Sequence, residues 1–353
     1  MRLNHPIVSI NLLTYNGRQY IENCLNSVLR QTYPYIEILI IDNASIDGTV
    51  NYLKQFSKET PNLRVIFNQK NLGFSAGHNQ GIKESQGEFI CCLNQDAVLD
   101  KDFIKMAMEI FEKDDKTSAV QGKLLRMHLI SKIIDTTGLV MLKNRRIIAR
   151  GQGQTDHGQF EKIEEIFGAD GAVPIYKRKA LEDVKLLVCQ RTDAQNYSQI
   201  KDLDNFCEYF DEDFFAYKED VDLAWRMRLY GWKSIYQPKA IAWHDRTAGD
   251  SAATNYFGII RERLKINKFA KYLSFKNQRL TQIKNEQPWL LLKHLPWFLP
   301  KEIASWFYVL FFEKYTWKAI KDLFKQMPRA WQKRKIIMNK KKAGVKEIKK
   351  WFR

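Results

Sequence analysis

The chain has 353 residues, 45% of them hydrophobic, which suits one large or two ordinary globular domains and excludes wholesale disorder. Its five cysteines are scattered without metal-type spacing, which indicates a reducing compartment and packing roles rather than a disulfide framework. The net charge is +17, and residues 281–353 hold 18 lysines and arginines against 5 acidic residues, so they carry 13 of these charges. This asymmetry indicates a basic C-terminal appendage on a nearly neutral domain.

Strand and helix patterns alternate through the first part of the chain. The predicted strands cover residues 7–13, 36–41, 63–67 and 90–93, and the predicted helices cover residues 19–31 and 49–58. Residues 71–81, NLGFSAGHNQG, are expected to form a glycine-rich loop that leads into a helix. Such alternation predicts an α/β fold with a mostly parallel sheet and helices on both faces.

The patterns change character after Asp100. Helices are predicted to about Lys113 and over residues 216–229, strands over 119–125, 147–149 and 234–243, and polar segments over 151–160 and 188–205. From about Phe257 the chain is helical, aromatic and basic. We therefore expect an α/β domain over residues 1–255 and a helical region over residues 256–353.

Polar side chains follow the first two predicted strands at their carboxyl ends, where open α/β sheets bind ligands. Thr14 and Asn16 follow the first strand, and Asp42 ends the second. An aspartate at this edge can accept a hydrogen bond from the imide N–H of uracil or thymine, while hydroxyls and amides hold the ribose. We expect a ligand role for Asp42 and a helix N-cap role for Asp47.

The fourth predicted strand ends in the sequence ICCLNQDAVLD, residues 90–100. The apolar run delivers Asp96 to the same sheet edge, although a plain loop aspartate that solvates the strand end is an alternative. The NLGFSAGHNQG segment matches neither a Walker A loop nor a dinucleotide fingerprint. Its small residues let a backbone approach a ligand closely, and a tight loop before a helix is the alternative.

Acidic residues cluster over residues 211–222, beside Phe214, Phe215 and Trp225. Acid clustering next to apolar side chains can raise a carboxylate pKa toward the range of a general base, and an ordinary acidic first helical turn is the alternative. His244 closes a late strand, where a histidine is either structural or a metal ligand.

Together these motifs resemble the family 2 inverting glycosyltransferases with the GT-A fold, over about Ile7 to Gly249. The family's order is kept by TYNG, IIDNAS with DGT, NLGFSAGHNQGI, LNQDAVL, GADGAVPIYKRKAL, FDEDFFAYKEDVDLAWR and the late His244. The forms of NLGF..G.NQGI, LN.D and RGQGQTDHGQF are most similar to the rhamnosyltransferase branch. The resemblance implies a Rossmann-like, mostly parallel sheet flanked by helices, followed by a helical, basic and aromatic C-terminal appendage.

The resemblance also implies roles for single residues in binding a nucleoside-diphosphate sugar. The implied donor-binding residues are Thr14, Asn16, Asp42, Asn71, Gly73, Asn94 and Asp96. Asp96, at the family's DxD-type position, would hold Mg²⁺ or Mn²⁺ with His244, because hard cations take oxygen ligands and neutralise a leaving diphosphate. Asn94 replaces the first acidic position of that motif, which lowers the charge that the protein offers to a metal.

Asp220 matches the family's catalytic base and would deprotonate an acceptor hydroxyl that displaces the diphosphate with inversion. The implied acceptor-binding residues are Asp170, Glu219 and Trp225. The expected donor sugar is L-rhamnose in its dTDP- or UDP-linked form. The expected acceptor is a glycan or a lipid-linked molecule of cell-surface polysaccharide synthesis.

Residues 288–317, PWLLLKHLPWFLPKEIASWFYVLFFEKYTW, are apolar and aromatic, but no uninterrupted run reaches the roughly 18 residues that a bilayer span requires. Prolines are expected to break the segment into short helices. Its tryptophans and the following lysines suit an anionic membrane interface. Since the N-terminus also lacks a signal peptide, we expect a cytoplasmic protein that begins at Met1 and attaches to the inner face of the membrane. A helical subdomain packed on the core, with a solvated basic tail, is the alternative.

Two other functions fit parts of the sequence. A sugar nucleotidyltransferase would need a glycine-rich, basic phosphate loop after the first strand, which TYNGRQY matches poorly. Nucleic-acid binding by the basic tail is disfavoured because no DNA- or RNA-binding module is recognisable and residues 211–222 are acidic. We therefore expect no nucleic-acid partner.

Overall fold

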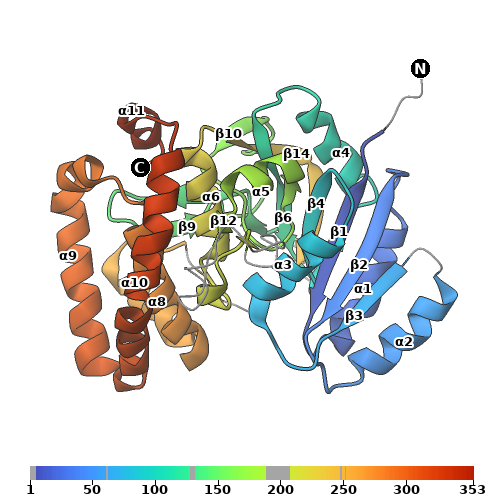
Figure 1. Cartoon of the computed structure of the whole chain (residues 1–353), viewed down its shortest axis with the longest axis horizontal. Helices are drawn as coiled ribbons and strands as arrows, with labels where there is room; N and C mark the ends of the chain where they lie inside the picture. The colour runs from blue at the N-terminus through green and yellow to red at the C-terminus, as the bar shows by residue number, and fades with distance from the viewer. Residues whose placement is uncertain (1–4, 61–62, 128–131, 188–206, 247–248, 251) are drawn as a thin grey trace, which may run out of the picture.

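The computed structural model describes residues 5–60, 63–127, 132–187, 207–246, 249–250 and 252–353, so the predicted insertion over 188–205 lies outside the described residues. The strands of its main sheet are β1 (Val8–Thr14), β2 (Ile36–Asp42), β3 (Leu63–Phe67), β4 (Phe89–Asn94), β5 (Ala97–Leu99), β6 (Thr117–Arg126), β7 (Ile134–Thr136), β10 (Glu164–Ile166), β11 (Ile175–Lys177) and β14 (Lys233–His244). They are ordered β10-β14-β6-β11-β4-β1-β2-β3, with β5 beside β14 and β7 beside β6. Strands β3, β2, β1 and β4 run parallel, as β6 and β14 do, which confirms the mostly parallel α/β fold (Figure 1).

Helices cover both faces of this sheet. They are α1 (Arg18–Leu29), α2 (Thr49–Glu59), α3 (Gly73–Glu84), α4 (Phe103–Phe111), α5 (Arg178–Val184) and α6 (Glu219–Leu229). Helices α1, α2 and α4 pack into one hydrophobic core, and α3, α5 and α6 into the other. Because successive strand residues point to opposite faces, Cys91 lies in the first core and Cys92 in the second, both as free buried thiols.

The strand register brings the polar strand ends together. Thr14 lies opposite Asp42, Leu13 lies opposite Asn94, and His244 lies opposite Ala97, the residue after Asp96. Two smaller strand pairs, β8 (Leu139–Met141) with β9 (Ile147–Ala149) and β12 (Leu186–Leu187) with β13 (Cys207–Glu208), lie outside the main sheet. The carboxyl edge of the parallel strands is therefore where the predicted site residues gather.

The glycine-rich loop expected over residues 71–81 is wrong from Gly73 onward, because Gly73 begins α3. A Cβ atom at Gly77 would lie 2.5 Å from Leu13 Cδ1, and one at Gly81 would lie 2.8 Å from Ile41 Cδ1. Real Cβ atoms do not approach other carbons so closely, so these glycines allow α3 to lie directly on β1 and β2. Their small size serves close helix–sheet packing here.

The C-terminal region forms α7 (Tyr256–Lys265), α8 (Lys268–Asn285), α9 (Pro288–Phe312), α10 (Trp317–Lys340) and α11 (Val345–Lys349), at the end of the molecule away from β3 (Figure 1). The prediction that prolines divide this segment is wrong, because Pro288 begins α9 and Pro296 and Pro300 lie inside it. A proline is tolerated at a helix start, and each internal proline removes one backbone donor while its neighbours keep theirs. In the described residues, no helix combines the length and the apolarity that crossing a bilayer requires.

These helices pack on the α/β domain. Leu290, Ile337, Ile348 and Phe352 belong to the second core, and the backbone N–H of Arg353 donates to the Met141 carbonyl. The described C-terminal end is therefore docked against the α/β domain, which is the packing arrangement that the sequence left as an alternative.

Part of the acidic cluster of residues 211–222 anchors these helices. Lys333 of α10 donates to Glu208 at 2.8 Å, to Asp213 at 2.9 Å and to Asp211, while Lys284 of α8 also donates to Asp211. The two lysines hold the pKa of Asp211 far below its usual range although burial opposes them. The positive charges that relieve repulsion in the cluster thus come from helices far away in the sequence.

Candidate active site

A cavity of about 420 Å³ opens beside the carboxyl ends of β4 and β14. Among the predicted site residues it is lined by Asn94, Asp170, Glu219, Asp220 and His244. These residues come from β4, the segment after β10, the start of α6 and the end of β14. Residues far apart in the sequence therefore meet around one cavity, which is the usual form of a small-molecule site.

Asp220 lies at the start of α6 with both carboxylate oxygens held by backbone donors. Its Oδ2 accepts from the Gly171 N–H at 3.1 Å, and its Oδ1 accepts from the Val221 N–H at 2.7 Å. Burial, followed by the negative charge of Asp170, raises the pKa of Asp220 to about 6. A carboxylate tuned in this way is largely ionised at neutral pH yet basic enough to accept a proton.

Glu219 is the second acid at this end of α6. Burial, and then the charge of Asp220, raises the pKa of Glu219 well above its usual range. Its Oε2 atom is buried and has no hydrogen-bond partner among the described residues. Both acids of the pair therefore hold their protons more strongly than usual, and the pKa of Asp220 is about 6.

The turn that leads into α6 is strained. Phe215, Tyr217 and Lys218 have φ angles of 64°, 68° and 76°, a conformation that residues other than glycine seldom adopt. Asn277 of α8 holds the turn, because its Nδ2 donates to the carbonyls of Ala216 and Tyr217, both at 2.8 Å. The C-terminal region thus fixes the backbone that presents Asp220, a role that the sequence did not reveal.

A chain of charged side chains crosses the floor of the site. His244 Nε2 lies 3.4 Å from Asp96 Oδ1, and His244 Nδ1 lies 2.9 Å from Asp135 Oδ2. Arg246 joins Asp135 at 2.6 Å to Asp170 at 3.3 Å. Burial disfavours the charged forms of both His244 and Asp135. Hydrogen bonds and opposite charges nevertheless lower the pKa of Asp135 to about 2 and raise that of His244 to about 9.

Asp96 and His244 can hold a divalent cation only with help from a ligand. Among the described residues no group of three or more His, Cys, Asp or Glu side chains gathers in a metal-binding arrangement. Mg²⁺ commonly takes one or two carboxylates and completes its shell with substrate phosphates and water. A metal-binding histidine usually has its second ring nitrogen on a carboxylate, as His244 has on Asp135. The residues present therefore fit a cation that is shared with a diphosphate and that displaces the proton of His244, because a histidine nitrogen binds a metal only in its unprotonated form.

The predicted nucleoside-binding residues lie beyond this cavity, along the ends of β1 and β2. Thr14 Oγ1 donates to Gln95 Oε1 at 2.6 Å, and the Asn16 N–H donates to Ser45 Oγ at 2.8 Å. Asp42 is fully buried; its Oδ1 accepts from the Ser45 N–H, while its Oδ2 has no hydrogen-bond partner among the described residues. Gln95, which holds the first turn, was not singled out from the sequence.

Three further residues singled out from the sequence lie at helix starts: Asp47, expected as a cap, and Asn71 and Gly73, expected to bind the donor. The predicted N-cap role of Asp47 is wrong, because Gly48 is the N-cap of α2; Asp47 instead precedes the cap and accepts from the Thr49 N–H at 3.1 Å. Asn71 likewise accepts from the Gly73 N–H at 2.8 Å at the start of α3. A Cβ atom at Gly73 would lie 2.6 Å from the Phe215 ring, so this glycine allows the strained turn to approach.

Trp225 lies elsewhere than predicted. Its side chain is fully buried in the second core and its ring packs edge-on against Phe352, with ring centroids 5.9 Å apart. Because a core side chain on the buried face of α6 cannot contact an acceptor, Trp225 is corrected to a packing residue. Asp222 and Arg226 also point inward from α6 as a fully buried ion pair at 3.0 Å.

The mostly parallel sheet, with a cavity at its carboxyl edge, defines a nucleotide-sugar transferase fold of the GT-A class. Residues 9–184 match the family model described as glycosyl transferase family 2. The chain belongs to this family, which confirms the assignment to family 2, while the rhamnosyltransferase branch stays a prediction.

Relatives and solved structures agree with this class. The chain is 27% identical over 240 residues to the poly-beta-1,6-N-acetyl-D-glucosamine synthase of Staphylococcus epidermidis, which covers 67% of this chain and 49% of that protein. The chain thus spans about half the length of the curated relatives it matches. The structure of S. aureus TarS 1-349 in complex with UDP-GlcNAc gives a TM-score of 0.53 at 16% identity, covering 95% of this chain and 87% of that one. GalNAc-T7 with UDP, GalNAc and Mn²⁺ gives 0.57 at 13% identity, covering 80% and 48%.

Proposed function

We propose that the protein is an inverting glycosyltransferase that moves a sugar from a nucleoside diphosphate to a hydroxyl group of a glycan or lipid-linked acceptor in cell-surface polysaccharide synthesis. The observation that carries this proposal is Asp220, a carboxylate held by two backbone donors at the wall of a cavity, with its pKa raised to about 6.

In the proposed reaction Asp220 takes the proton of the acceptor hydroxyl. The acceptor oxygen forms a bond to the anomeric carbon while the bond from that carbon to the diphosphate oxygen breaks, and the electron pair leaves with the diphosphate. Attack on the face opposite the leaving group inverts the anomeric configuration. A positioned base is required because a hydroxyl is a poor nucleophile at neutral pH. Asp170 and Glu219, which line the same cavity, are proposed to contact the acceptor.

Donor binding is proposed at the carboxyl ends of β1, β2 and β4, through the seven residues predicted from the sequence. Asp96 and His244 would hold Mg²⁺ or Mn²⁺ there. When bound, such a cation neutralises charge on the leaving diphosphate. Arg246 and Asp135 keep His244 in place by the contacts described above, so they are proposed as positioning residues for this side of the site.

The donor sugar is proposed as L-rhamnose in its dTDP- or UDP-linked form, on the motif forms of residues 71–82 and 93–96. A second candidate is UDP-GlcNAc, because the matched synthase is named for N-acetyl-D-glucosamine and the matched TarS structure contains UDP-GlcNAc. Calorimetric binding of dTDP-rhamnose, UDP-GlcNAc and GDP-mannose, with and without Mn²⁺, distinguishes them. Metal-dependent binding of one donor supports the proposal, and no binding of any donor under either condition would reject it.

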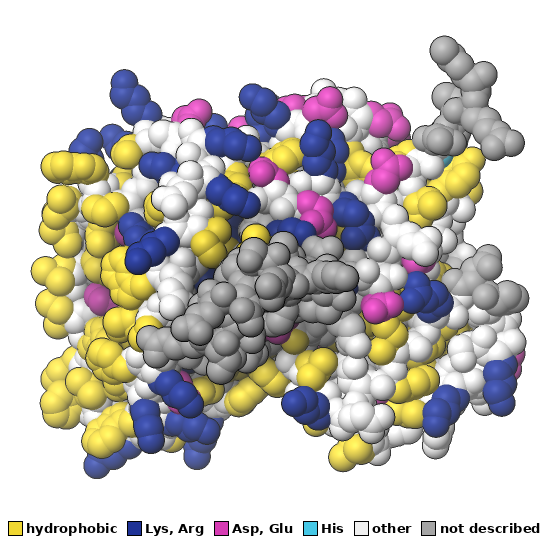
Figure 2. All heavy atoms as spheres, viewed as in Figure 1, with side chains coloured by type: hydrophobic (Ala, Val, Ile, Leu, Met, Phe, Trp, Pro, Cys, Tyr) yellow, Lys and Arg dark blue, Asp and Glu magenta, His cyan; other side chains and the backbone are white. Residues whose placement is uncertain are grey.

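Attachment to the inner face of an anionic membrane is also proposed. Hydrophobic side chains gather along the edge of the molecule formed by α9, with lysines and arginines beside them (Figures 1 and 2). The exposed apolar residues of this helix, termed the α9 face, are Trp289, Leu292, Trp297, Leu299, Ile303, Phe307, Leu310, Phe311 and Phe312. Exposed apolar patches of this kind, bordered by basic residues, mark membrane or protein interaction sites.

A further inference from the structure

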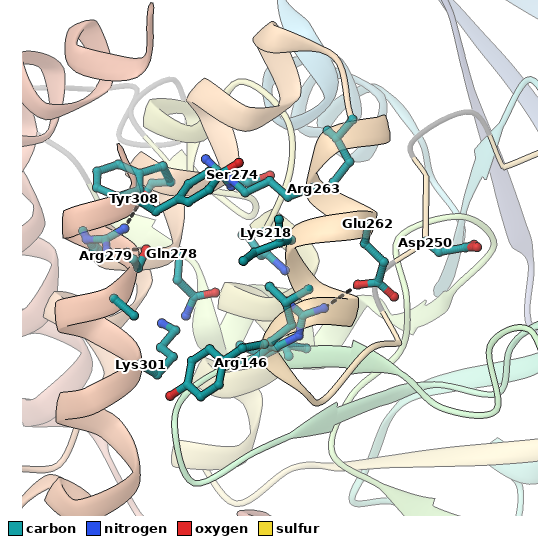
Figure 3. A pocket seen from close by; sticks show the side chains of 18 residues that line it. Arg146, Lys218, Asp250, Glu262, Arg263, Ser274, Gln278, Arg279, Lys301 and Tyr308 are labelled. Atoms are coloured by element: carbon teal, nitrogen blue, oxygen red, sulfur yellow. Dashed lines mark hydrogen bonds and ion pairs between the residues drawn. The ribbon is translucent and has the colours of Figure 1, made fainter. Parts of the chain in front are cut away.

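A second cavity, of about 280 Å³, adjoins the candidate active site (Figure 3). It lies between α7, α8 and α9 and the segment that joins β8 to β9. The residues that line both cavities are Ile147, Lys218, Asp250, Ile266 and Ser274. Lys218 therefore lies between the two cavities, and in the sequence it precedes the proposed base, Asp220, by two residues.

The second cavity is lined by five cationic residues, Arg146, Lys218, Arg263, Arg279 and Lys301, and by the carboxylates of Asp250 and Glu262. Four of the five cations have carboxylate partners: Arg146 pairs with Glu262 at 2.6 Å, Lys301 with Glu302 at 3.0 Å, Arg279 with Glu302 at 2.6 Å, and Arg263 with Glu313. No carboxylate or hydrogen-bond acceptor among the described residues lies within bonding distance of the Lys218 ammonium group.

The surroundings of Lys218 are unfavourable to its charge. Burial lowers the pKa of Lys218, and the charges of Arg146 and Lys301 lower it further, against the opposing effect of Asp220 and Glu219. A partly buried cation without a carboxylate partner is costly unless a counter-ion arrives. Among the described residues, Lys218 is the cation of this cavity without a carboxylate partner, so an anion that enters the cavity would pair with Lys218.

The remaining walls of the cavity are largely apolar. They include Ile259 and Ile260 of α7, Phe275 of α8, and Ala304 and Tyr308 of α9. Ile303 and Phe307, which directly precede Ala304 and Tyr308 in α9, are 60% and 54% exposed and belong to the α9 face. Apolar walls and a cationic end thus occur in one cavity, next to a surface that is itself apolar.

We propose that this second cavity is the acceptor-side subsite for a phosphate ester, in which Lys218, with Lys301 and Arg146, binds the phosphate and the walls formed by α7, α8 and α9 contact the group esterified to it. This inference rests on the proposed function, since it assigns the acceptor class of the same enzyme. Ammonium and guanidinium groups make strong, charge-assisted hydrogen bonds to phosphate oxygens. The phosphate ester can come from a lipid-linked acceptor or from a phosphate within a hydrophilic glycan.

Equilibrium binding tests the subsite without requiring glycosyl transfer. Calorimetry on the full chain compares decyl phosphate, glycerol 3-phosphate and the neutral decyl glucoside. We expect decyl phosphate to bind most tightly, and Lys218→Asn and Lys301→Gln each to weaken it about tenfold, since charge-assisted hydrogen bonds are lost. Asparagine suits position 218 because it tolerates positive φ, and thermal unfolding checks that each variant is folded. Lys325→Gln, at an exposed lysine of α10, is the charge-matched control and should bind like wild type.

The outcomes separate the two proposals. Tighter binding of decyl phosphate than glycerol 3-phosphate identifies a lipid-linked source, and equal binding that depends on Lys218 identifies a phosphate in a hydrophilic glycan. Folded Lys218→Asn and Lys301→Gln proteins that bind decyl phosphate as wild type does would overturn the subsite, whatever the enzyme's activity. Lys218-dependent binding in a protein that turns over no donor would instead keep the phosphate site and reject the transferase.

Discussion

Asp220 owes its raised pKa first to burial and then to the neighbouring charge of Asp170. A base acts in its ionised form, so kcat/KM should fall as the pH decreases through about 6 and should level off above it. Asp170→Asn removes a negative neighbour, which lowers the pKa of Asp220 and should move the acidic limb of the profile to lower pH. A pH–rate profile of both proteins checks this expectation. A limb that stays in place in Asp170→Asn would contradict the proposed coupling.

The residue roles that a sequence can predict are those within one short motif. Asp220, Asp170 and Glu219 were predicted and do line one cavity. Asp135 was not, because its partners His244 and Arg246 are more than a hundred positions away and IIDTTG has no distinctive neighbours. Asn277 was missed for the same reason: nothing near it in α8 indicates that it holds the turn before α6.

At the scale of elements, the placement of α6 depends on a close contact with the segment after β10. A Cβ atom at Gly168 would lie 2.2 Å from Ala224 Cβ, and neither atom can move away by a rotamer change. Gly168→Ala should therefore cost about 1–3 kcal/mol of unfolding free energy, as overpacked cores do. Gly344→Ala, where the nearest atom is 4.0 Å from the added carbon, is the matched control. Equal stability of the two variants in urea denaturation would show that α6 is not held in this way.

The helices α8 and α10 are joined to the α/β domain by buried charges. Lys333→Met leaves Glu208, Asp211 and Asp213 without their shared cation, which should destabilise the protein by about 3–5 kcal/mol. Lys335→Met, at an exposed lysine on the same helix, should have little effect. Urea denaturation followed by circular dichroism measures both. A Lys333→Met protein as stable as wild type would mean that the C-terminal helices are not anchored by these pairs.

The predicted boundaries of helices and strands agree with the structure where one hydrophobic pattern dominates the segment. The apolar runs of β1, β2 and β4 were placed to within a residue or two because burial on both faces needs continuous apolar side chains. Helices α3 and α9 were mispredicted, since glycine and proline usually interrupt helices. In α3 the glycines fit a sheet surface, and in α9 tertiary packing carries the helix past Pro296 and Pro300. In both helices the reason for the misprediction is a contact with another element, which the local sequence does not show.

At the scale of the whole molecule, the α9 face is the surface through which membrane attachment is proposed. Ile303→Asp with Phe311→Asp replaces two exposed side chains of this face, 60% and 64% accessible, so the fold should tolerate the change. Partition onto vesicles with anionic lipid should fall at least about tenfold, because each apolar side chain contributes roughly 1.5–3 kcal/mol when buried. Wild-type binding should also weaken with added salt.

The control for this experiment is Ile46→Asp, an 89% exposed apolar residue that follows β2. It should partition as wild type does. Wild-type protein that stays in solution with anionic vesicles at low salt would contradict membrane attachment. The α9 face would then be left for another copy of the chain or another protein to cover.

The most direct test of the central claim is sugar transfer by wild type and Asp220→Asn. The measurement is release of nucleoside diphosphate from the donor that calorimetry selects, with a lipid and glycan extract as acceptor and Asp115→Asn, at a fully exposed residue, as control. Loss of the base should lower the rate by about 10²–10⁴-fold while donor affinity and the control rate stay unchanged. An Asp220→Asn enzyme that transfers sugar at the wild-type rate would contradict the account of the site.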